Sequence, residues 1–423
     1  MRPLETIQGL CAHEQRGAGT DSERRAARWL EQQLRAGGRE ARIEAFWCRP
    51  NWALAHAWHA LLALAGSLLS VRAPLAGGAL ALAALLSTVV DWLTGSSLGR
   101  RLTPERASQN VVAPPSRAPA SASVGLILTA NYDAGRTGIV HSRWFRTPLA
   151  LARRHLGGLT FGWLGWLTIA FGWVVAIAAA RWLGAAGNAV DGLQAVPTIG
   201  LVVAVAALLE LASARFGPAA GDNASGVAVA LAAARALDAA PPAGVAVHVL
   251  LAGAGDGEGI GLRSHLRRHR HSLRASETIV LGLAPCADSH AVWWHSDGQL
   301  VPLRYDATLR SLCRRLREAG FEPQLAPLRG RGASPALQAR MRALPAVALG
   351  LLDPRGLVAR SHAPDDTAEL IDERSLDRAV QLTLAFVDAI DAMLTGEADQ
   401  ADAARRHPAA TGPRVLPKRT AGQ

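Results

Sequence analysis

The chain has 423 residues, of which 50% are hydrophobic and only 5% aromatic, and its formal net charge is +11. This length suits one large domain with an addition, or two domains. The basic excess is typical of proteins that bind nucleic acid or anionic lipid, and of membrane proteins with basic flanks. No stripe of aromatic and basic residues is present, so we expect no nucleic-acid partner.

The cysteines indicate free thiols in a reducing compartment, because they are far apart and form no CxxC pair. They are Cys11, Cys48, Cys286 and Cys313.

The N-terminal segment, residues 1–52, is predicted to belong to a soluble domain. Met1–Gly9 contains no apolar run, so no cleavable signal peptide is expected. An amphipathic helix is predicted over Glu23–Ala36, and the alternation over Ala41–Trp47 predicts a strand.

Two pairs of long apolar runs interrupt the soluble pattern, and each run is about as long as a bilayer core requires. They are Ala53–Val71, Leu75–Leu93, Phe161–Leu183 and Ala195–Leu211. We predict two transmembrane hairpins, residues 53–93 and 159–216, and thus four membrane-spanning helices. Buried helix pairs are the alternative, but runs this long without a polar face fit a soluble core poorly. Asp91 and Glu210 lie near the domain-side ends, which allows a functional role or simple interfacial solvation.

Arginine placement predicts the orientation, because basic residues favour the cytoplasmic side. The far-side loops carry only Arg72 and Arg181. The domain-side flanks carry Arg49, Arg100, Arg101, Arg106, Arg143, Arg146, Arg153, Arg154 and Arg215. We therefore expect a multi-pass integral membrane protein whose soluble domain and both termini are cytoplasmic.

The remaining soluble segments, residues 94–158 and 217–396, show an α/β pattern, and the polar tail 397–423 is expected to be disordered. Predicted strands cover Gln109–Ala113, Val124–Ala130, Val245–Leu251, Thr278–Leu283 and Ala346–Leu352. Predicted helices cover Val227–Leu237, Gly261–His271, Ala307–Ala319 and Glu373–Leu394. The basic residues of the second of these helices are interpreted as a solvated face, or as a contact with anionic lipid headgroups.

The hexamer Gly221–Gly226 lies directly before the predicted helix Val227–Leu237. Asn223 and Ser225 are predicted to cap the helix, and Gly226 to allow close packing. Asp222 would then lie at a helix N-terminus, free to bind a ligand. The alternative is a capped helix start without further function.

Four motifs follow one another along the chain. They are Asn131–Asp133, Asp222–Gly226, Gly255–Asp256 and Ser361–Thr367. In this order they resemble the family-28 metallopeptidases, the zinc aminopeptidase family that includes glutaminyl cyclases. The likeness is strengthened by the N-terminal turn Arg16–Thr20 and by the segments Arg331–Pro335 and Leu344–Val347. It covers nearly all soluble parts of the chain and excludes the hairpins. The resemblance implies a three-layer α/β domain around a central mixed sheet.

The resemblance also implies metal ligands. The bridging aspartate of the family falls on Asp222, its late histidine on His362, and its glutamate ligand on Asp256. Aspartate is shorter than glutamate by one methylene, roughly 1.5 Å, so the backbone must shift for Asp256 to bind. Two carboxylates and one imidazole with an open position suit one catalytic zinc ion.

Other positions of the family pattern have lost their function. The general base falls on Gly255, the first histidine on Asn131, and the second-metal aspartate near Ala284. Asp133 and Asp366 remain as supporting residues of the degenerate site, and Glu258 is a candidate substitute base. A missing base normally costs about 10²–10⁴-fold in rate.

These features predict a membrane-anchored, metallopeptidase-like protein with one residual zinc site and no general base, silent or strongly reduced in activity. It would bind the bilayer, and it would bind a peptide or protein at the cleft that holds the substrate in the resembled family. The alternative is a single-zinc aminopeptidase-type hydrolase or cyclase that acts on peptide N-termini. Transport through the four helices is a weaker third possibility, because the runs lack repeated polar residues.

Overall fold

The computed structural model describes residues 2–117, 121–142, 162–298, 300–318, 324–327, 333–353 and 360–406, together with residues 119, 144, 148 and 358. Several residues used in the sequence predictions lie outside this part of the chain. They are Arg143, Arg146, Arg153 and Arg154 of the basic flank, Arg331 and Gly332 of the late motif, and the tail beyond Arg406.

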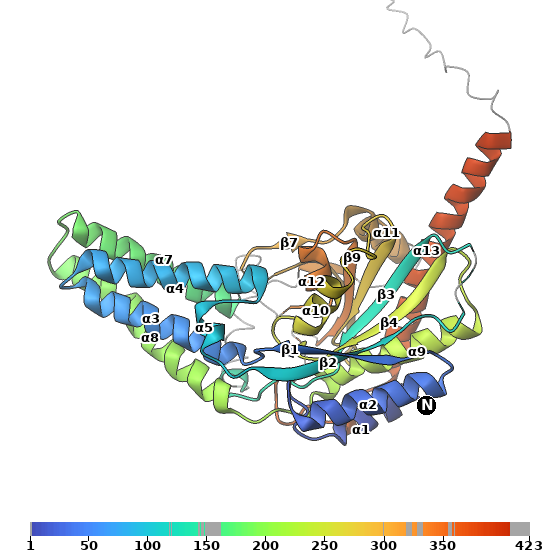
Figure 1. The fold of residues 1–423 in the computed structure, drawn as a ribbon, viewed down its shortest axis with the longest axis horizontal. Coiled ribbons are helices and arrows are strands. Elements are labelled where there is room, and N and C mark those ends of the chain that lie inside the picture. The colour runs from blue at the N-terminus through green and yellow to red at the C-terminus, as the bar shows by residue number, and fades with distance from the viewer. Residues whose placement is uncertain are drawn as a thin grey trace, which may run out of the picture.

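A twisted nine-stranded mixed sheet forms the centre of the domain (Figure 1), in the order β1-β2-β4-β3-β5-β9-β6-β7, with β8 pairing β6. The strands are β1 Arg42–Cys48, β2 Arg106–Ala113, β3 Val124–Asn131, β4 Val245–Ala252, β5 Thr278–Leu283, β6 His290–Asp297, β7 Leu303–Arg304, β8 Gln324–Pro327 and β9 Ala346–Leu352. Strands β4, β3, β5 and β9 run parallel, so their carboxyl ends meet at one edge, where sites form in such sheets.

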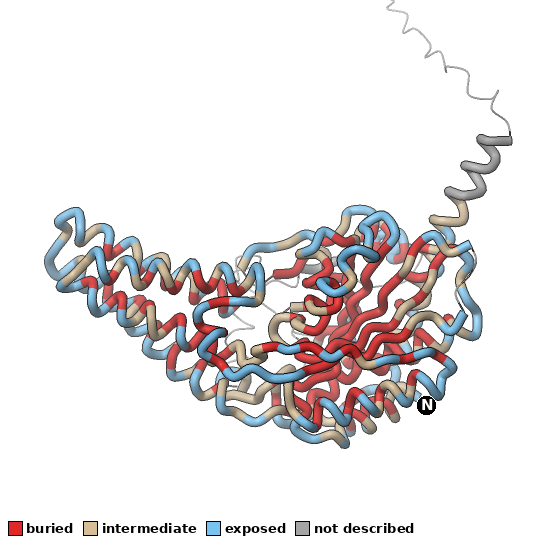
Figure 2. The backbone as a smooth tube through the Cα atoms, viewed as in Figure 1, coloured by how far each residue is buried: buried red, intermediate tan, exposed pale blue. Residues whose placement is uncertain are grey.

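Helices cover both faces of the sheet. On one face the large core cluster contains apolar residues of five helices. These are α1 Pro3–Cys11, α2 Asp21–Ala36, α9 Ser225–Ala239, α11 Ala307–Glu318 and α13 Glu373–Arg406. On the other face a second cluster includes residues of α10 Ile260–Arg268 and α12 Leu337–Met341. The three-layer arrangement with a central mixed sheet is therefore confirmed (Figure 2).

The predicted strands fall within a few residues of the observed ones, whereas α1, β6 and β8 were not predicted. Two local predictions were wrong. Asn223 and Ser225 do not cap α9, whose preceding residue Ala224 makes no side-chain cap. The helix α13 continues to Arg406, past the predicted start of the disordered tail.

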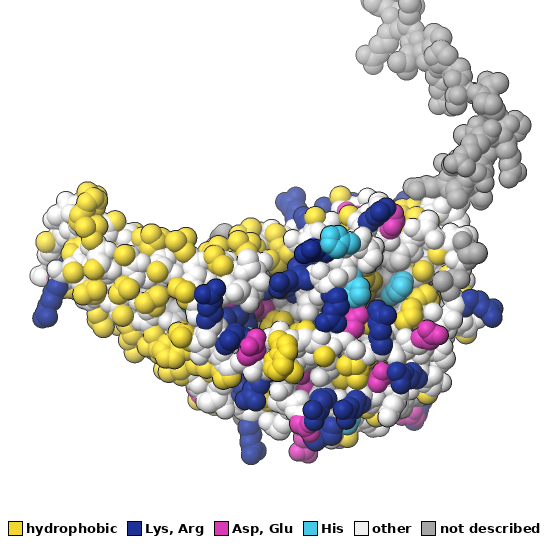
Figure 3. Space-filling view, in the orientation of Figure 1, with side chains coloured by type: hydrophobic (Ala, Val, Ile, Leu, Met, Phe, Trp, Pro, Cys, Tyr) yellow, Lys and Arg dark blue, Asp and Glu magenta, His cyan; other side chains and the backbone are white. Residues whose placement is uncertain are grey.

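Four apolar helices form a separate bundle that projects from the domain (Figure 1). They are α3 Trp52–Ser70, α4 Pro74–Thr94, α7 Trp163–Trp182 and α8 Asn188–Ser213. Small residues such as Ala57, Ala60 and Ala84 are fully buried between them, which allows close helix approach. The outer surface is apolar, with Leu86 56% exposed and Ile199 64% exposed (Figure 3). The two predicted hairpins thus pack as one unit.

Five helices, rather than the predicted four, are long and apolar enough to span a membrane. The fifth is the Glu373–Gly396 part of α13. Its residues Leu382, Phe386 and Ile390 are packed into the main core of the domain. The apolar composition of this fifth helix is therefore explained by its burial in the core of the domain.

The bundle is joined to the domain by a buried ionic cluster. Arg100, from the short helix α5 Leu98–Arg101, contacts Asp91 at 2.8 Å and also pairs with Glu258. His56 Nε2 lies 3.4 Å from the Asp91 carboxylate and 3.7 Å from that of Glu258. Asp91 is 0% exposed, so the interpretation of this carboxylate as solvated at the interface was wrong.

The predicted close packing of Gly226 is confirmed, since a Cβ there would lie 2.1 Å from the backbone oxygen of Leu283. We expect Gly226→Ala to lower the free energy of unfolding by about 1–3 kcal/mol, because backbone must move to admit the methyl group. Thermal unfolding of the purified protein measures this change.

Gly200→Ala is the matched control, since a Cβ at this helical glycine meets nothing within 4 Å. Helix propensity predicts a gain of up to about 1 kcal/mol for the control. Equal stability of the two variants would contradict the packing argument.

Candidate metal centre

Asp222 lies on a single π-helical turn, Ala220–Ala224, directly before α9. The carboxylate of Asp366 fixes this turn by accepting the backbone N–H groups of Gly221 at 2.9 Å and Asp222 at 3.0 Å. Asp366 is buried, and burial raises its pKa to about 6, with the nearby Asp222 charge adding to the rise. The Ser361 hydroxyl donates to Asp222 Oδ2 at 3.0 Å.

The remaining motif residues hold the turn rather than cap the helix. Ser225 Oγ donates to the carbonyl of Gly221 and accepts the N–H of Cys286, at 2.6 and 2.8 Å. Asn223 Nδ2 donates to the carbonyl of Asp133 at 2.7 Å. The hexamer therefore ties the loops after β3 and β5 to the turn that carries Asp222.

Asp256 lies in the loop after β4, and a second buried carboxylate orients this loop. Asp133 accepts the N–H of Gly255 at 2.9 Å and that of Asp256 at 3.1 Å. Burial raises the pKa of Asp133 to about 7, with the Asp256 charge as the next cause. Glu23 accepts the N–H of Ala254 at 2.9 Å, and burial raises its pKa to about 8.

His362 is held in one tautomer by a backbone contact. Its Nδ1 lies 3.1 Å from the carbonyl oxygen of Arg136. Because a carbonyl oxygen only accepts, Nδ1 must carry the proton, so the lone pair of the neutral ring is on Nε2, the nitrogen that faces Asp222 and Asp256. The backbone of His362 is left-handed, with φ 57°.

Backbone strain is concentrated in the loops that carry the three predicted ligands. Besides His362, Ala219 before the Asp222 turn has φ 49° and Ala254 before Asp256 has φ 45°. Left-handed backbone in residues other than glycine costs on the order of 1–3 kcal/mol each and is frequent at functional sites. The surrounding hydrogen bonds maintain these conformations.

His362 lies between the other two predicted ligands and is close to each of them. His362 Nε2 lies 3.3 Å from Asp256 Oδ1 and 3.8 Å from Asp222 Oδ2, and the side chains are 13–16% exposed. Ligand atoms of a tetrahedral zinc ion lie about 3.3 Å apart for bonds near 2.0–2.1 Å. Burial raises the pKa of Asp256; His362 opposes this rise, whereas Asp222 adds to it. One imidazole and two carboxylates are donor types that zinc takes, but their ligand atoms are not all within 4.8 Å of one another, so the two aspartates must move closer for one ion to bind all three.

No protein-family model and no curated protein matches the sequence. Among solved structures, a zinc aminopeptidase from Bacillus subtilis matches with a TM-score of 0.52 and 14% identity, over 91% of this chain and 94% of that one. LapA from Legionella pneumophila gives 0.50 and 11%, over 92% and 72%. A glutaminyl cyclase from Fimbriiglobus ruber gives 0.49 and 12%, over 92% and 94%.

The chain has a zinc-aminopeptidase-like fold. The predicted family-28 metallopeptidase-like architecture is thereby confirmed, and identities this low concern the fold alone. In this fold Asp256 follows the carboxyl end of β4, Asp222 lies in the turn before α9, and His362 lies in the segment after β9.

The space beside Gly255, the residue predicted to fall on the general-base position, is closed by packing. A Cβ on Gly255 would lie 2.2 Å from both Cγ and Oδ1 of Asn131. No side chain of any size fits there unless Asn131 moves. Oδ1 of Asn131 is itself buried, and no hydrogen bond to it is formed by the described part of the chain. The side chain of Asn131 and the absence of a side chain at Gly255 are therefore sterically linked.

The remaining predicted residues lie apart from the trio. Glu258 points to Arg100 and His56 at the base of the bundle, so its carboxylate is engaged in the ionic cluster. Ala284 is buried just after β5, and Cys286 is fully buried with a pKa that burial raises above the usual range.

Two aromatic residues at the site were missed by the sequence analysis. Trp52 begins α3, and its indole Nε1 lies 3.5 Å from Asp256 Oδ2. The ring of His141, which ends the short helix η1 Ile139–His141, stacks on His362 with centroids 4.4 Å apart. Trp52 was placed at the end of the soluble segment 1–52 and His141 in the soluble segment 94–158, and neither belonged to a recognised motif.

The steric link between Gly255 and Asn131 can be tested by a double-mutant cycle. We expect Gly255→Ala alone to destabilise the domain by about 1–3 kcal/mol, because its methyl group overlaps Asn131. Combining it with Asn131→Ala should recover part of this loss, with a coupling energy of about 0.5–3 kcal/mol. Thermal unfolding of the four proteins gives the cycle, and strictly additive effects would contradict the occlusion.

Proposed function

We propose that this chain is an integral membrane protein that binds one zinc ion through Asp222, Asp256 and His362 and recognises peptide amino termini at the membrane surface, with little or no hydrolysis. The observation that carries the proposal is the His362 ring, whose Nδ1 faces a backbone carbonyl and whose Nε2 faces two carboxylates.

Bound zinc in such a site would polarise a substrate carbonyl. The chain's own residues orient the donors: Asp366 and Asp133 fix the backbone of the two aspartates, and Arg136 fixes the imidazole. Trp52 and His141 border the same side chains and would contact a bound peptide end. These groups supply binding and orientation without a proton acceptor at the base position.

Weak hydrolysis follows from the closed position at Gly255. The chain carries no carboxylate there, and Asn131 fills the space that a longer side chain would need. Glu258 is not a replacement, because it pairs with Arg100. Loss of a general base costs about 10²–10⁴-fold in rate.

The apolar bundle supports a membrane location for the site. Its helices present exposed leucine, valine and isoleucine side chains along their length (Figure 3). Trp52 and Trp163 stack at 4.8 Å where the bundle meets the domain, and tryptophan is enriched at membrane interfaces. Because Trp52 also contacts Asp256, the proposed zinc site lies near the lipid headgroups.

A second candidate function is a single-zinc hydrolase or cyclase that acts on peptide N-termini. It is favoured by one observation, the stacking of His141 on His362. An imidazole beside the metal donors is a group that could move a proton to or from a substrate.

Zinc content tests the metal proposal. In protein purified without chelator, we expect His362→Ala and Asp222→Ala each to lower zinc by about one ion per chain relative to the unmodified protein. Asp365→Ala, an exposed neighbour of the same loop, is the control and should keep the metal. Elemental analysis measures the difference, and equal zinc in all four proteins would contradict the site.

Activity separates the two candidate functions. With aminoacyl anilides and N-terminal glutamine peptides, we expect no turnover above that of His362→Ala. Zinc-dependent turnover that His362→Ala abolishes would overturn the first candidate and favour the second. In that case His141→Ala should lower the rate by about 10²–10⁴-fold, while peptide binding is retained.

Fusion reporters test the membrane proposal. A fluorescent reporter after Gln423 should be active inside the cell, and alkaline phosphatase inserted after Gly187, in the turn between α7 and α8, should be active outside. The protein should also resist extraction by alkaline carbonate. The reverse reporter pattern, or release by carbonate, would contradict the proposed topology.

A further inference from the structure

We propose that Glu44, His265 and His269 form a second transition-metal site, of the kind that binds zinc, on the face of the sheet covered by α10. These residues are separate from the trio described above, and no step of the proposed function uses them. The inference therefore stands or fails independently of the first site.

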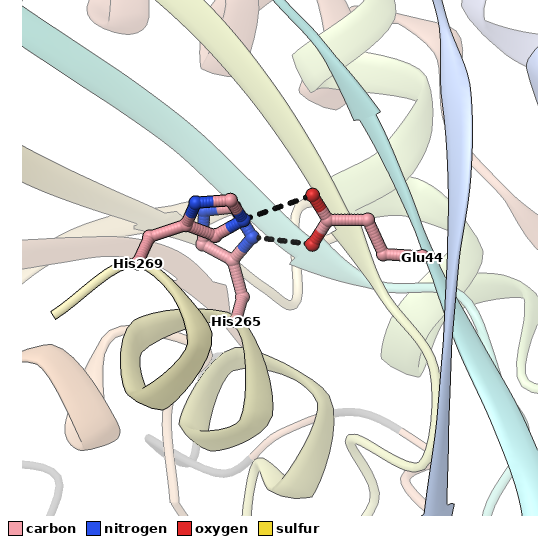
Figure 4. Close-up of side chains that lie close together, drawn as sticks. All are labelled: Glu44, His265 and His269. Carbon is pink, nitrogen blue, oxygen red and sulfur yellow. Dashed lines mark hydrogen bonds and ion pairs between the residues drawn. The ribbon is translucent and has the colours of Figure 1, made fainter. Parts of the chain in front are cut away.

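The donor atoms of this second trio already converge (Figure 4). His265 Nδ1 lies 2.9 Å from Glu44 Oε2, and His269 Nε2 lies 3.0 Å from Glu44 Oε1. All three ligand atoms lie within 4.8 Å of one another. An ion with bonds near 2.0–2.1 Å needs donors about 3.3 Å apart, so each contact must lengthen by only a few tenths of an ångström.

Secondary structure sets the arrangement. His265 and His269 are four residues apart at the end of α10, so their rings share one face, with centroids 4.4 Å apart. Glu44 projects from β1 opposite them, as Figure 4 shows. Neutral imidazole and carboxylate are ligands that suit zinc, and three protein ligands leave one position open. His269 is 26% exposed, which gives an ion and a fourth ligand access from solvent.

The burial of the cluster argues for a built site. The side chains of Glu44 and His265 are only 7% and 8% exposed. The interpretation of the α10 residues as a solvated face was therefore wrong for His265, and also for Arg263, which is buried. In the protein without metal, His265 Nδ1 and His269 Nε2 donate to the Glu44 carboxylate, so the three donors are oriented, and an ion that binds there takes the place of these two protons.

Two arginine charges near the site oppose a cation, but both side chains are exposed. Arg42 lies 3.2 Å and Arg268 3.9 Å from the Glu44 carboxylate. Their side chains are 62% and 46% exposed, so solvent screens both charges, and Arg268 Nη2 also donates to the carbonyl oxygen of Ala45 at 2.6 Å. A bound ion would join the edge strand β1 to α10, whose first turn follows the loop that carries Asp256 and Glu258.

The test is a cobalt titration of the full-length protein in detergent, prepared without a polyhistidine tag and in a His362→Ala background. The His362→Ala substitution removes one ligand of the first site, so Glu44, His265 and His269 form the expected tetrahedral site. We expect the visible absorption of tetrahedral cobalt, displaced by zinc. Adding His269→Ala or Glu44→Gln should weaken binding about tenfold or more, equivalent to about 1.4 kcal/mol.

His271→Ala is the matched control, because His271 is an exposed histidine of the same segment and should leave the titration unchanged. Circular dichroism verifies that each variant is folded, and Glu44→Gln keeps a hydrogen-bond acceptor for the rings. Absence of tetrahedral cobalt in the background protein would overturn the inference. Equal affinity of the His269→Ala, Glu44→Gln and His271→Ala variants would overturn it as well.

Discussion

Two buried carboxylates determine the geometry of the candidate zinc site. Asp366 accepts two successive backbone N–H groups at the Asp222 turn, and Asp133 accepts two at the Asp256 loop. Each fixes a main-chain segment and so the direction of the aspartate that it carries. A carboxylate that accepts backbone N–H groups in a buried site forms charge-assisted hydrogen bonds, which are stronger than neutral ones. The left-handed backbone at Ala219 and Ala254 is tolerated because these contacts hold it in place.

Packing also fills the space beside Gly255, and the loop that carries Asp256 is attached to the apolar bundle. Asn131 occupies the space beside Gly255, so a glutamate introduced at position 255 alone has no room for its side chain. At the other side of the loop, Glu258 reaches Arg100, which also pairs with Asp91 of α4. One short loop therefore contacts both the metal donors and the base of the bundle. Movement of the bundle would displace Asp256 through Glu258 and Trp52.

Much of this arrangement could be predicted from the sequence. Strands with continuous apolar runs carry a strong signal, and so does the specific motif Asp222–Gly226. The strand preceding Asp133 and the trio of Asp222, Asp256 and His362 were predicted in this way. Features that depend on tertiary contacts could not be. The predicted capping roles of Asn223 and Ser225 were wrong, because local capping rules do not reveal that Asp133 and Cys286 lie nearby. Glu44 and His265 are 221 residues apart in the chain, and no local pattern links them. The Glu373–Leu394 helix was predicted as part of the soluble α/β pattern, and it packs into the main core although its composition also suits a membrane helix.

The central claim is that one cation binds between the His362 imidazole and two carboxylates, while the neighbouring second-metal position is empty of donors. Anomalous diffraction at the zinc edge, from crystals of protein purified without chelator, tests it most directly. The account predicts a single peak within bonding distance, about 2.0–2.2 Å, of His362 Nε2 and of an oxygen from each of Asp222 and Asp256. A second peak beside Asn131, or no peak between the three side chains, would contradict it.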